Sequence, residues 1–194
     1  MTDFAAARRH MVDGQVRTTD VTDLRVISAM LEVPRERFMP PVSTALAYLD
    51  LDVPVGGGRR LLRPMVLAKL IQAAELEPTD RVLDVGCATG YTAAVLSRIA
   101  GRVIALEQDA GLAKAASYSL ASQPNVDVVS GALATRRACS GAASPQPVVG
   151  LNPGAKASFS FRLTRSGSFR IASLVPGQEQ ARMWDVLEVT RGGR

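Results

Sequence analysis

The stretch Val82-Leu83-Asp84-Val85-Gly86-Cys87-Ala88-Thr89-Gly90-Tyr91 decides the fold of this chain. Its first residues have the apolar pattern of a short buried strand, a turn with two glycines follows, and residues 91–99 have the pattern of a helix. Gly86 and Gly90 permit the dihedral angles of a tight turn and the close approach of a ligand. The helix that follows presents free N–H groups and the positive end of its dipole, which suit a carboxylate or a phosphate. We therefore predict a nucleotide-like cofactor at this turn.

A second acid supports this prediction. Glu107 closes the next predicted strand, residues 102–106, and an acid at that place accepts hydrogen bonds from both hydroxyls of a ribose. Asp84, at the end of the first strand, can hold an ammonium group directly or through water. The alternative is a tight strand–helix turn with a glutamate on the surface. The succession of strand, turn, helix, strand and terminal acid favours a nucleoside cofactor.

Strands and helices alternate from this turn onward, with a further helix predicted at residues 111–121 and a further strand at 126–129. Such alternation predicts parallel pairing and right-handed crossovers. We therefore expect an α/β protein with a Rossmann-like, doubly wound and mostly parallel sheet. Beyond Gly131 the alternation stops, and we expect the C-terminal part of the sheet to be truncated or irregular. Two short stretches there, residues 158–163 and 169–174, have the alternation of a hairpin.

The residues before the turn have helical patterns. We expect helices at residues 5–16, 22–32 and 64–76, with Thr22 as the cap of the second helix and residues 50–58 as a loop. One domain then contains three parts. They are an N-terminal helical, substrate-side segment at 1–76, a cofactor-binding half at 77–135 and an irregular segment of unknown fold at 136–194.

The composition is that of a globular domain, with 194 residues of which 47% are hydrophobic and 21% charged. No apolar run approaches the ~18 residues that cross a bilayer, and the first residues lack the pattern of a secretory signal, so we expect a cytoplasmic protein without membrane contact. Cys87 and Cys139 form neither a disulfide framework nor a metal site. The arginines behind the net charge of +5 are scattered without interleaved aromatic residues, which favours a solvated basic face over nucleic-acid binding.

The glycine turn also resembles a known motif. Gly86-x-Ala88-x-Gly90, with Asp84 before it, is similar to the first motif of class I S-adenosylmethionine-dependent methyltransferases, with Ala88 where that family usually has glycine. Longer stretches within residues 4–134 narrow the resemblance to the protein-L-isoaspartate O-methyltransferases. They are Met11-Val12-x-x-Gln15-Val16-Arg17, Val33-Pro34-Arg35-Glu36-x-Phe38, Ala47-Tyr48-x-Asp50, Val53-Pro54-Val55-Gly56 and Gly90-Tyr91-Thr92-Ala93.

This resemblance implies an enzyme that transfers a methyl group from S-adenosylmethionine to the free α-carboxylate of an L-isoaspartyl residue in a damaged protein. The methyl ester then collapses to a succinimide, which returns some chains to normal aspartate. The implied partner is an isoaspartyl-containing protein or peptide, and we expect no metal. The expected cofactor-binding residues are Asp84, Gly86, Ala88, Gly90, Tyr91 and Glu107.

The chain departs from the family's pattern on the substrate side. Where the family has Gly-x-Thr-Ile-Ser-x-Pro, this chain has Gly58-Arg59-Arg60-Leu61-Leu62-Arg63-Pro64. Leu62 stands at the position of the hydroxyl and cannot hydrogen-bond a carboxylate. The three arginines can hold a carboxylate bidentately instead, and Arg60 and Arg63 are our candidates for binding that of the substrate. The alternative is that all three are surface charges before a helix.

A second departure follows the third predicted strand, where the family has Gly-Asp-Gly and this chain has Gly131-Ala132-Leu133. The family's acid faces the adenine amine, so Ala132 removes one cofactor contact. A diverged paralogue with a reduced C-terminal half explains the losses. A reading-frame error near Thr135-Arg136 also explains them, and translating the genomic DNA in the other frames would distinguish the two.

These departures leave three functions open. The chain is an isoaspartate methyltransferase, a related methyltransferase that acts on another carboxylate or a small molecule, or a non-catalytic remnant. In each case an incomplete sheet leaves an exposed strand edge and an exposed apolar face, which predicts self-association or poor solubility.

Overall fold

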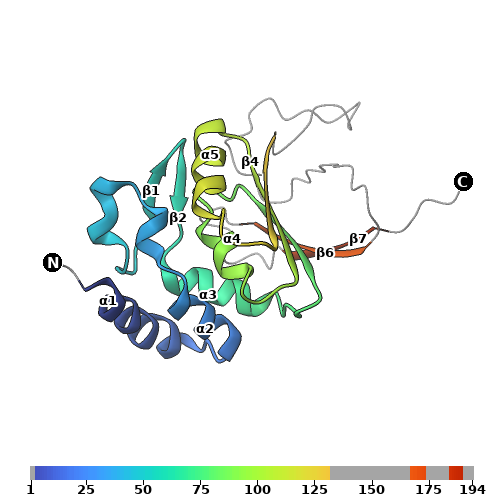
Figure 1. Ribbon diagram of the computed structural model, residues 1–194. Helices are drawn as coiled ribbons and strands as arrows, with labels where there is room; N and C mark the ends of the chain where they lie inside the picture. The colour runs from blue at the N-terminus through green and yellow to red at the C-terminus, as the bar shows by residue number, and fades with distance from the viewer. Residues whose placement is uncertain (1–2, 132–166, 174–183, 190–194) are drawn as a thin grey trace, which may run out of the picture.

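The computed structural model describes residues 3–131, 167–173 and 184–189 (Figure 1). At its centre is one sheet with the strand order β5-β4-β3-β6-β7. In sequence order its first three strands are β3 (Arg81–Val85), β4 (Arg102–Glu107) and β5 (Val126–Ser130). They pair in parallel, and the predicted α/β class with a mostly parallel sheet is confirmed.

The sheet continues into the C-terminal part of the chain. Strand β6 (Gly167–Ser173) runs parallel to β3, and β7 (Trp184–Val189) runs antiparallel to β6. The strand predicted at 169–174 therefore exists and has an antiparallel neighbour, but it also lies parallel to β3, which the hairpin prediction missed. Alternation of side chains along one strand does not reveal the direction of its neighbours. The other predicted strand, at 158–163, lies outside the described residues.

The structure contains the helices predicted near the N-terminus, but the N-cap of the second helix differs from the prediction. Helix α1 (Phe4–Met11) continues into a π-helical turn, η1 (Val12–Val16), and a short 3₁₀ turn, η2 (Arg17–Thr19). Helix α2 (Leu24–Glu32) begins after Asp23, whose carboxylate accepts a hydrogen bond of 2.8 Å from the backbone N–H of Arg25. The prediction that Thr22 caps this helix is wrong, because the stronger cap stands one residue later.

The segment between α2 and β3 is shaped by prolines and glycines. Two 3₁₀ turns, η3 (Arg35–Phe38) and η4 (Pro41–Leu46), lead to a hairpin of β1 (Val53–Gly56) and β2 (Arg59–Leu61). The prediction of a loop over 50–58 is therefore wrong for β1. Pro54 and the glycine run hide this strand from pattern analysis, because both residue types are rare in strands. Helix α3 (Pro64–Ala73) then begins with proline in its first turn, as predicted.

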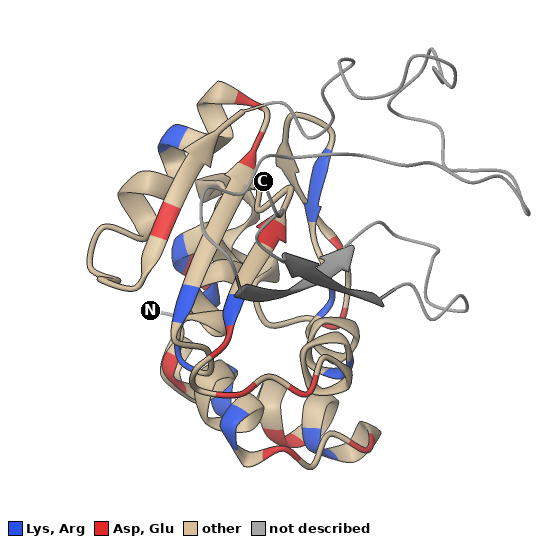
Figure 2. Cartoon of the chain, turned by 90° about the vertical axis from the view of Figure 1, so that its right-hand side faces the viewer, with Lys and Arg blue, Asp and Glu red and all other residues tan. Residues whose placement is uncertain are grey.

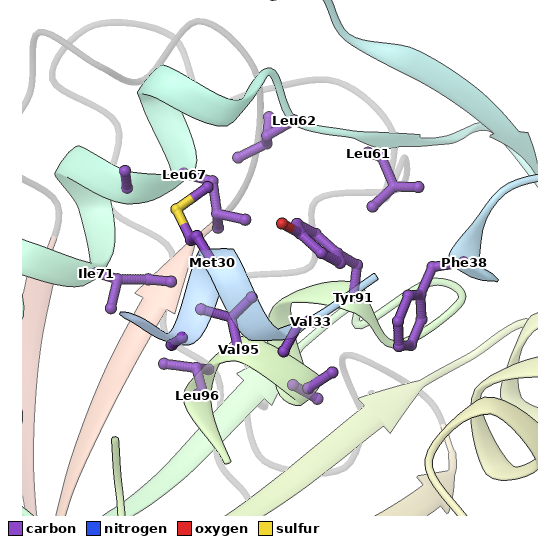
Figure 3. Close-up of a cluster of buried hydrophobic side chains, with 14 of the residues drawn as sticks. Met30, Val33, Phe38, Leu61, Leu62, Leu67, Ile71, Tyr91, Val95 and Leu96 are labelled. Atoms are coloured by element: carbon purple, nitrogen blue, oxygen red, sulfur yellow. The ribbon is translucent and has the colours of Figure 1, made fainter. Parts of the chain in front are cut away.

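One hydrophobic core joins the N-terminal helices to the sheet. Helices α4 (Tyr91–Leu96) and α5 (Ala110–Ser119) pack on the strands, and α2 packs on α4. In Figure 3 the side chains of Met30, Leu67 and Tyr91 point toward a common interior. All three are buried, so the helical segment and the helix after the glycine turn share packing and support each other.

Charges of both signs are interspersed along the helices in the view of Figure 2. Within the described part of the chain, no helix is both long enough and apolar enough to cross a membrane.

Candidate functional site

The glycine turn after β3 has the geometry that its sequence predicts. Gly86, Ala88 and Gly90 all have positive φ, at 79°, 51° and 94°. The N–H groups of Gly86 and Cys87 both donate to the carbonyl oxygen of Leu106, at 2.7 and 3.1 Å. These backbone bonds fold the turn against the end of β4, where the second predicted acid lies.

The structure brings that acid into direct contact with the turn. Glu107 has a fully buried side chain, and its Oε2 accepts a 2.9 Å hydrogen bond from the N–H of Ala88. Its Oε1 accepts from the N–H groups of Gln108 and Asp109, at 2.8 and 3.0 Å. Two cofactor residues predicted from separate motifs therefore form one cluster at the carboxyl ends of β3 and β4.

A side chain from the hairpin completes the cluster. Nη2 of Arg59 lies 3.1 Å from Oε1 of Glu107, and Nε lies 3.2 Å from Oε2. Burial by itself raises the pKa of Glu107, but hydrogen bonds from Arg59, Asp109 and Ala88 outweigh it and hold the pKa below its ordinary value. Glu107 is thus a buried carboxylate kept ionised by its neighbours.

Asp84 is the second buried acid of the site, and it is bound differently. Its Oδ2 has no hydrogen-bond partner among the described residues. Burial, and after it the charge of Glu107, raise the pKa of Asp84 to about 7. A buried oxygen without a partner calls for a ligand or a water. An ammonium group, held directly or through water, satisfies it, so Asp84 and Glu107 together fit a nucleoside cofactor that carries an amino group.

The tip of the β1–β2 hairpin rests on the start of α5, beside which it stands in Figure 1. A Cβ on Gly57 would lie 3.0 Å from Cδ1 of Leu112 and 3.1 Å from Oδ2 of Asp109. The same Asp109 caps α5 through a 2.9 Å hydrogen bond from the N–H of Leu112. Glycine therefore permits the close approach that places Arg59 over Glu107.

The two arginines predicted to hold a substrate carboxylate lie apart from this cluster. The backbone N–H of Arg63 donates to Oδ1 of Asp52 at 2.8 Å, and its Nε lies 3.4 Å from the same oxygen. Arg60 is exposed. Burial raises the pKa of Asp52, but hydrogen bonds from Arg63 and the charges of Arg63 and Arg60 bring it below its ordinary value. Both candidates therefore gather near Asp52 and not at the glycine turn.

Leu62 and Tyr91 have their side chains in the core. Leu62 is buried in the cluster shown in Figure 3. The ring of Tyr91 is fully buried and packs edge-on against Phe38, with ring centroids 5.6 Å apart. The structure thus leaves only the backbone of Tyr91 at the cofactor turn. Ala132 lies outside the described residues.

Sequence analysis missed one residue behind the site, Arg35. Its side chain is fully buried, Nε donates to the carbonyl oxygen of Ala47 at 2.8 Å, and Nη2 donates to that of Leu62 at 2.7 Å. The guanidinium also lies 4.8 Å from the ring centroid of Tyr91. Arg35 therefore ties the hairpin, the preceding loop and the start of α4 together. Its place in the Val-Pro-Arg-Glu stretch does not reveal this, because nothing local distinguishes a buried arginine from a solvated one.

Metal chemistry has no obvious ligands in the described segments, where no group of three or more histidine, cysteine, aspartate or glutamate side chains comes together. Cys87 is a buried free thiol whose pKa is raised by burial and by the charges of Asp84 and Glu107.

Comparison with known proteins points to one family. The family described as Protein-L-isoaspartate(D-aspartate) O-methyltransferase matches residues 6–133. The Protein-L-isoaspartate O-methyltransferase 1 of Rhodopseudomonas palustris is 42% identical over 120 residues, which cover 62% of this chain and 49% of the relative. The corresponding protein of Koribacter versatilis is 37% identical over 133 residues, which cover 68% and 60%. The chain spans about half the length of the curated relatives it matches.

Solved structures agree on the fold. A protein-L-isoaspartate O-methyltransferase superposes with a TM-score of 0.55 at 27% identity, over 64% of this chain and 42% of the other. A putative enzyme of the same description from Plasmodium falciparum, in complex with S-adenosyl-L-homocysteine, superposes with a TM-score of 0.51 at 19% identity, over 66% and 63%. The described residues therefore have an α/β methyltransferase fold.

Proposed function

The chain belongs to the protein-L-isoaspartate O-methyltransferase family, and on that basis we propose that it binds S-adenosylmethionine and methylates the α-carboxylate of L-isoaspartyl residues in damaged proteins or peptides. One observation carries the cofactor half of this proposal. Glu107, at the end of β4, meets the N–H of Ala88 in the turn after β3, while the buried Asp84 beside them has an oxygen without a partner among the described residues.

Each predicted cofactor residue then has a part. Glu107 accepts from the ribose hydroxyls, and Asp84 holds the ammonium group of the amino-acid moiety. Gly86, Ala88 and Gly90, all with positive φ, expose the backbone of the turn to the ligand. For Tyr91 the proposal uses only the backbone, because its ring is buried against Phe38.

The reaction asks little acid–base work of the protein. The bound cofactor supplies a methyl group activated by a sulfonium. The substrate carboxylate, which is already ionised, would accept that group as a methyl ester, leaving S-adenosylhomocysteine and transferring no proton. The chain must orient the carboxylate for in-line attack. Arg60 and Arg63, near Asp52, are the proposed cations that draw it to the substrate side.

Leu62 favours a second candidate function. Leucine lacks the hydroxyl that the family pattern has at this position, and the side chain of Leu62 is packed in the core. A methyltransferase of the same ancestry that acts on a different carboxylate, held by arginines alone, is consistent with that substitution.

The proposal is tested by transfer of labelled methyl from S-adenosylmethionine to an isoaspartyl peptide and to the matched aspartyl peptide, with the full chain. We expect base-labile label on the isoaspartyl peptide only. Label on neither peptide, with S-adenosylhomocysteine still bound in calorimetry, would favour the second candidate. A chain that shows neither binding heat nor a thermal shift with S-adenosylhomocysteine is a non-catalytic remnant.

A further inference from the structure

Arg59 crowds the carboxylate of Glu107, to which the proposed function assigns the ribose. A carboxylate offers about four lone-pair positions to donors. The backbone N–H groups of Ala88, Gln108 and Asp109 already donate to it. Nε and Nη2 of Arg59 add three contacts of 3.1–3.3 Å to the same two oxygens. About one position then remains beside the three backbone donors, and the proposed function gives it to the ribose, so cofactor and Arg59 compete for it.

We infer that Arg59 is a latch on Glu107, which the ribose of the cofactor displaces, and that the released guanidinium then binds the carboxylate of the substrate. This inference rests on the proposed function and extends it. It makes Arg59 a substrate-binding residue that links occupancy of the cofactor site to recognition of an anionic substrate.

Strand geometry selects Arg59 from the three arginines of this segment. Successive side chains of β2 point to opposite faces of the hairpin. Arg59 faces the buried Glu107, whereas Arg60 is exposed and Arg63 is bound to Asp52. Arg59 is therefore the arginine of this group that already reaches the cofactor turn.

The hairpin allows this release at small cost. The side chain of Arg59 is 32% exposed, so its guanidinium can turn away from Glu107 without opening the core. Gly56, Gly57 and Gly58 form the turn beside it, with φ of 101°, 56° and 71°, and glycines leave such a turn free to adjust. Glu107 keeps its three backbone donors after the release, and the ribose hydrogen bond takes the place of Arg59.

Affinity for S-adenosylhomocysteine, measured by calorimetry on the full chain, tests the latch. Arg59→Gln removes the competing charge, so the variant should bind about twofold to fivefold more tightly, the range expected from a partly exposed ion pair. Arg59→Lys keeps the charge but loses the fork and should gain less. Unchanged or weaker binding by Arg59→Gln, in a variant that still melts cooperatively, overturns the latch.

Two controls isolate the contact. Arg102→Gln breaks a similar pair with Asp127 at the other end of β4 and should leave the affinity unchanged. In a Glu107→Gln background the gain from Arg59→Gln should disappear, because the two residues act through each other. A gain that persists in that background overturns the inference.

Binding of an isoaspartyl peptide, with and without saturating S-adenosylhomocysteine, tests the transfer of Arg59 to the substrate. The peptide should bind at least about fivefold more tightly to the loaded protein, and Arg59→Gln should abolish the difference. Equal peptide affinities in the two states overturn the transfer. If the wild-type chain and Arg59→Gln are folded and neither binds S-adenosylhomocysteine, the proposed function itself fails. If both bind with equal affinity, only the inference fails.

Discussion

Arg35 shows what a single buried cation contributes to this fold. Its guanidinium donates to two carbonyl oxygens and lies over the ring of Tyr91. Arg35→Ala leaves both oxygens without this donor and opens a cavity, so we expect a loss of about 3 kcal/mol in the free energy of unfolding, measured with urea. Arg37→Ala, two residues away and exposed, is the matched control and should change stability by less than about 0.5 kcal/mol. Equal effects would mean that Arg35 contributes no more than a surface arginine.

Asp84 makes stability depend on pH in an unusual direction. Its pKa is raised from 3.8 to about 7 on folding. Between these values the folded chain keeps a proton that the unfolded chain has lost, so this group's contribution to stability is present at low pH and falls as pH rises toward 7. The slope is at most about 1.4 kcal/mol per pH unit.

Asp84→Asn tests this dependence, because it removes the titration with little change in shape. The difference in unfolding free energy between wild type and variant should move in favour of the variant from pH 5 to pH 7 and then level off. Asp127→Asn, at an exposed ion pair, is the matched control. Parallel pH profiles of wild type and Asp84→Asn would show that Asp84 titrates normally.

Local rules pointed to the candidate cofactor residues and not to the side chains that contact them. Gly86, Gly90 and Glu107 follow from the order of strand, turn and strand, which a short window of sequence contains. The pairing of Arg59 with Glu107 joins residues 48 positions apart, and sequence analysis chose the neighbouring Arg60 and Arg63 as candidates instead. Only the tertiary structure shows that Arg59 is the arginine that faces Glu107.

The β1–β2 hairpin is the element whose placement depends most on one residue. Gly57→Ala puts a Cβ 3.0 Å from Cδ1 of Leu112 and 3.1 Å from Oδ2 of Asp109, which cannot withdraw freely because it caps α5. Gly58→Ala has the same left-handed backbone and meets nothing within 4 Å. We expect Gly57→Ala to lower the unfolding free energy by about 1 kcal/mol more than Gly58→Ala does.

The pair of glycine variants also reports on the function proposed for the hairpin. Lifting the tip from α5 draws Arg59 from Glu107, so calorimetry should find tighter S-adenosylhomocysteine binding in Gly57→Ala than in Gly58→Ala. Identical stabilities and affinities in the two variants would show that the hairpin tip does not rest on α5.

Helices and strands with a clear hydrophobic periodicity were predictable from the sequence. Elements that contain proline and glycine were not. Helix α3 and strands β3 to β5 follow from apolar periodicity within each segment. Strand β1 contains Pro54 and ends in glycine, so its pairing depends on β2 and on the surface of α5. Its existence is a tertiary effect, which patterning within the segment cannot express.

For the whole molecule, we expect self-association through the outer edge of the sheet. Strand β5 is terminal in the described strand order, and its Val129 is 43% exposed. Sedimentation of the wild-type chain should show a dimer whose fraction of the total protein increases with concentration. Val129→Lys should shift it to monomer, because a lysine on an edge strand opposes pairing. Val42→Lys, at an exposed valine of η4 outside the sheet, is the control. A wild-type monomer at every concentration would contradict this expectation.

The two neighbours of β3 also determine the order in which the strands of the sheet pair during folding. On one side β3 meets β4, which follows after a single helix. On the other side it meets β6, which is synthesised after β5 and the long segment that follows it. Closing the larger loop costs more chain entropy, and contacts between distant residues form slowly. A nascent chain can therefore assemble β3, β4 and β5 while one side of β3 still faces water. Pulse-labelled hydrogen exchange should find the amides of β3 that face β6 protected last.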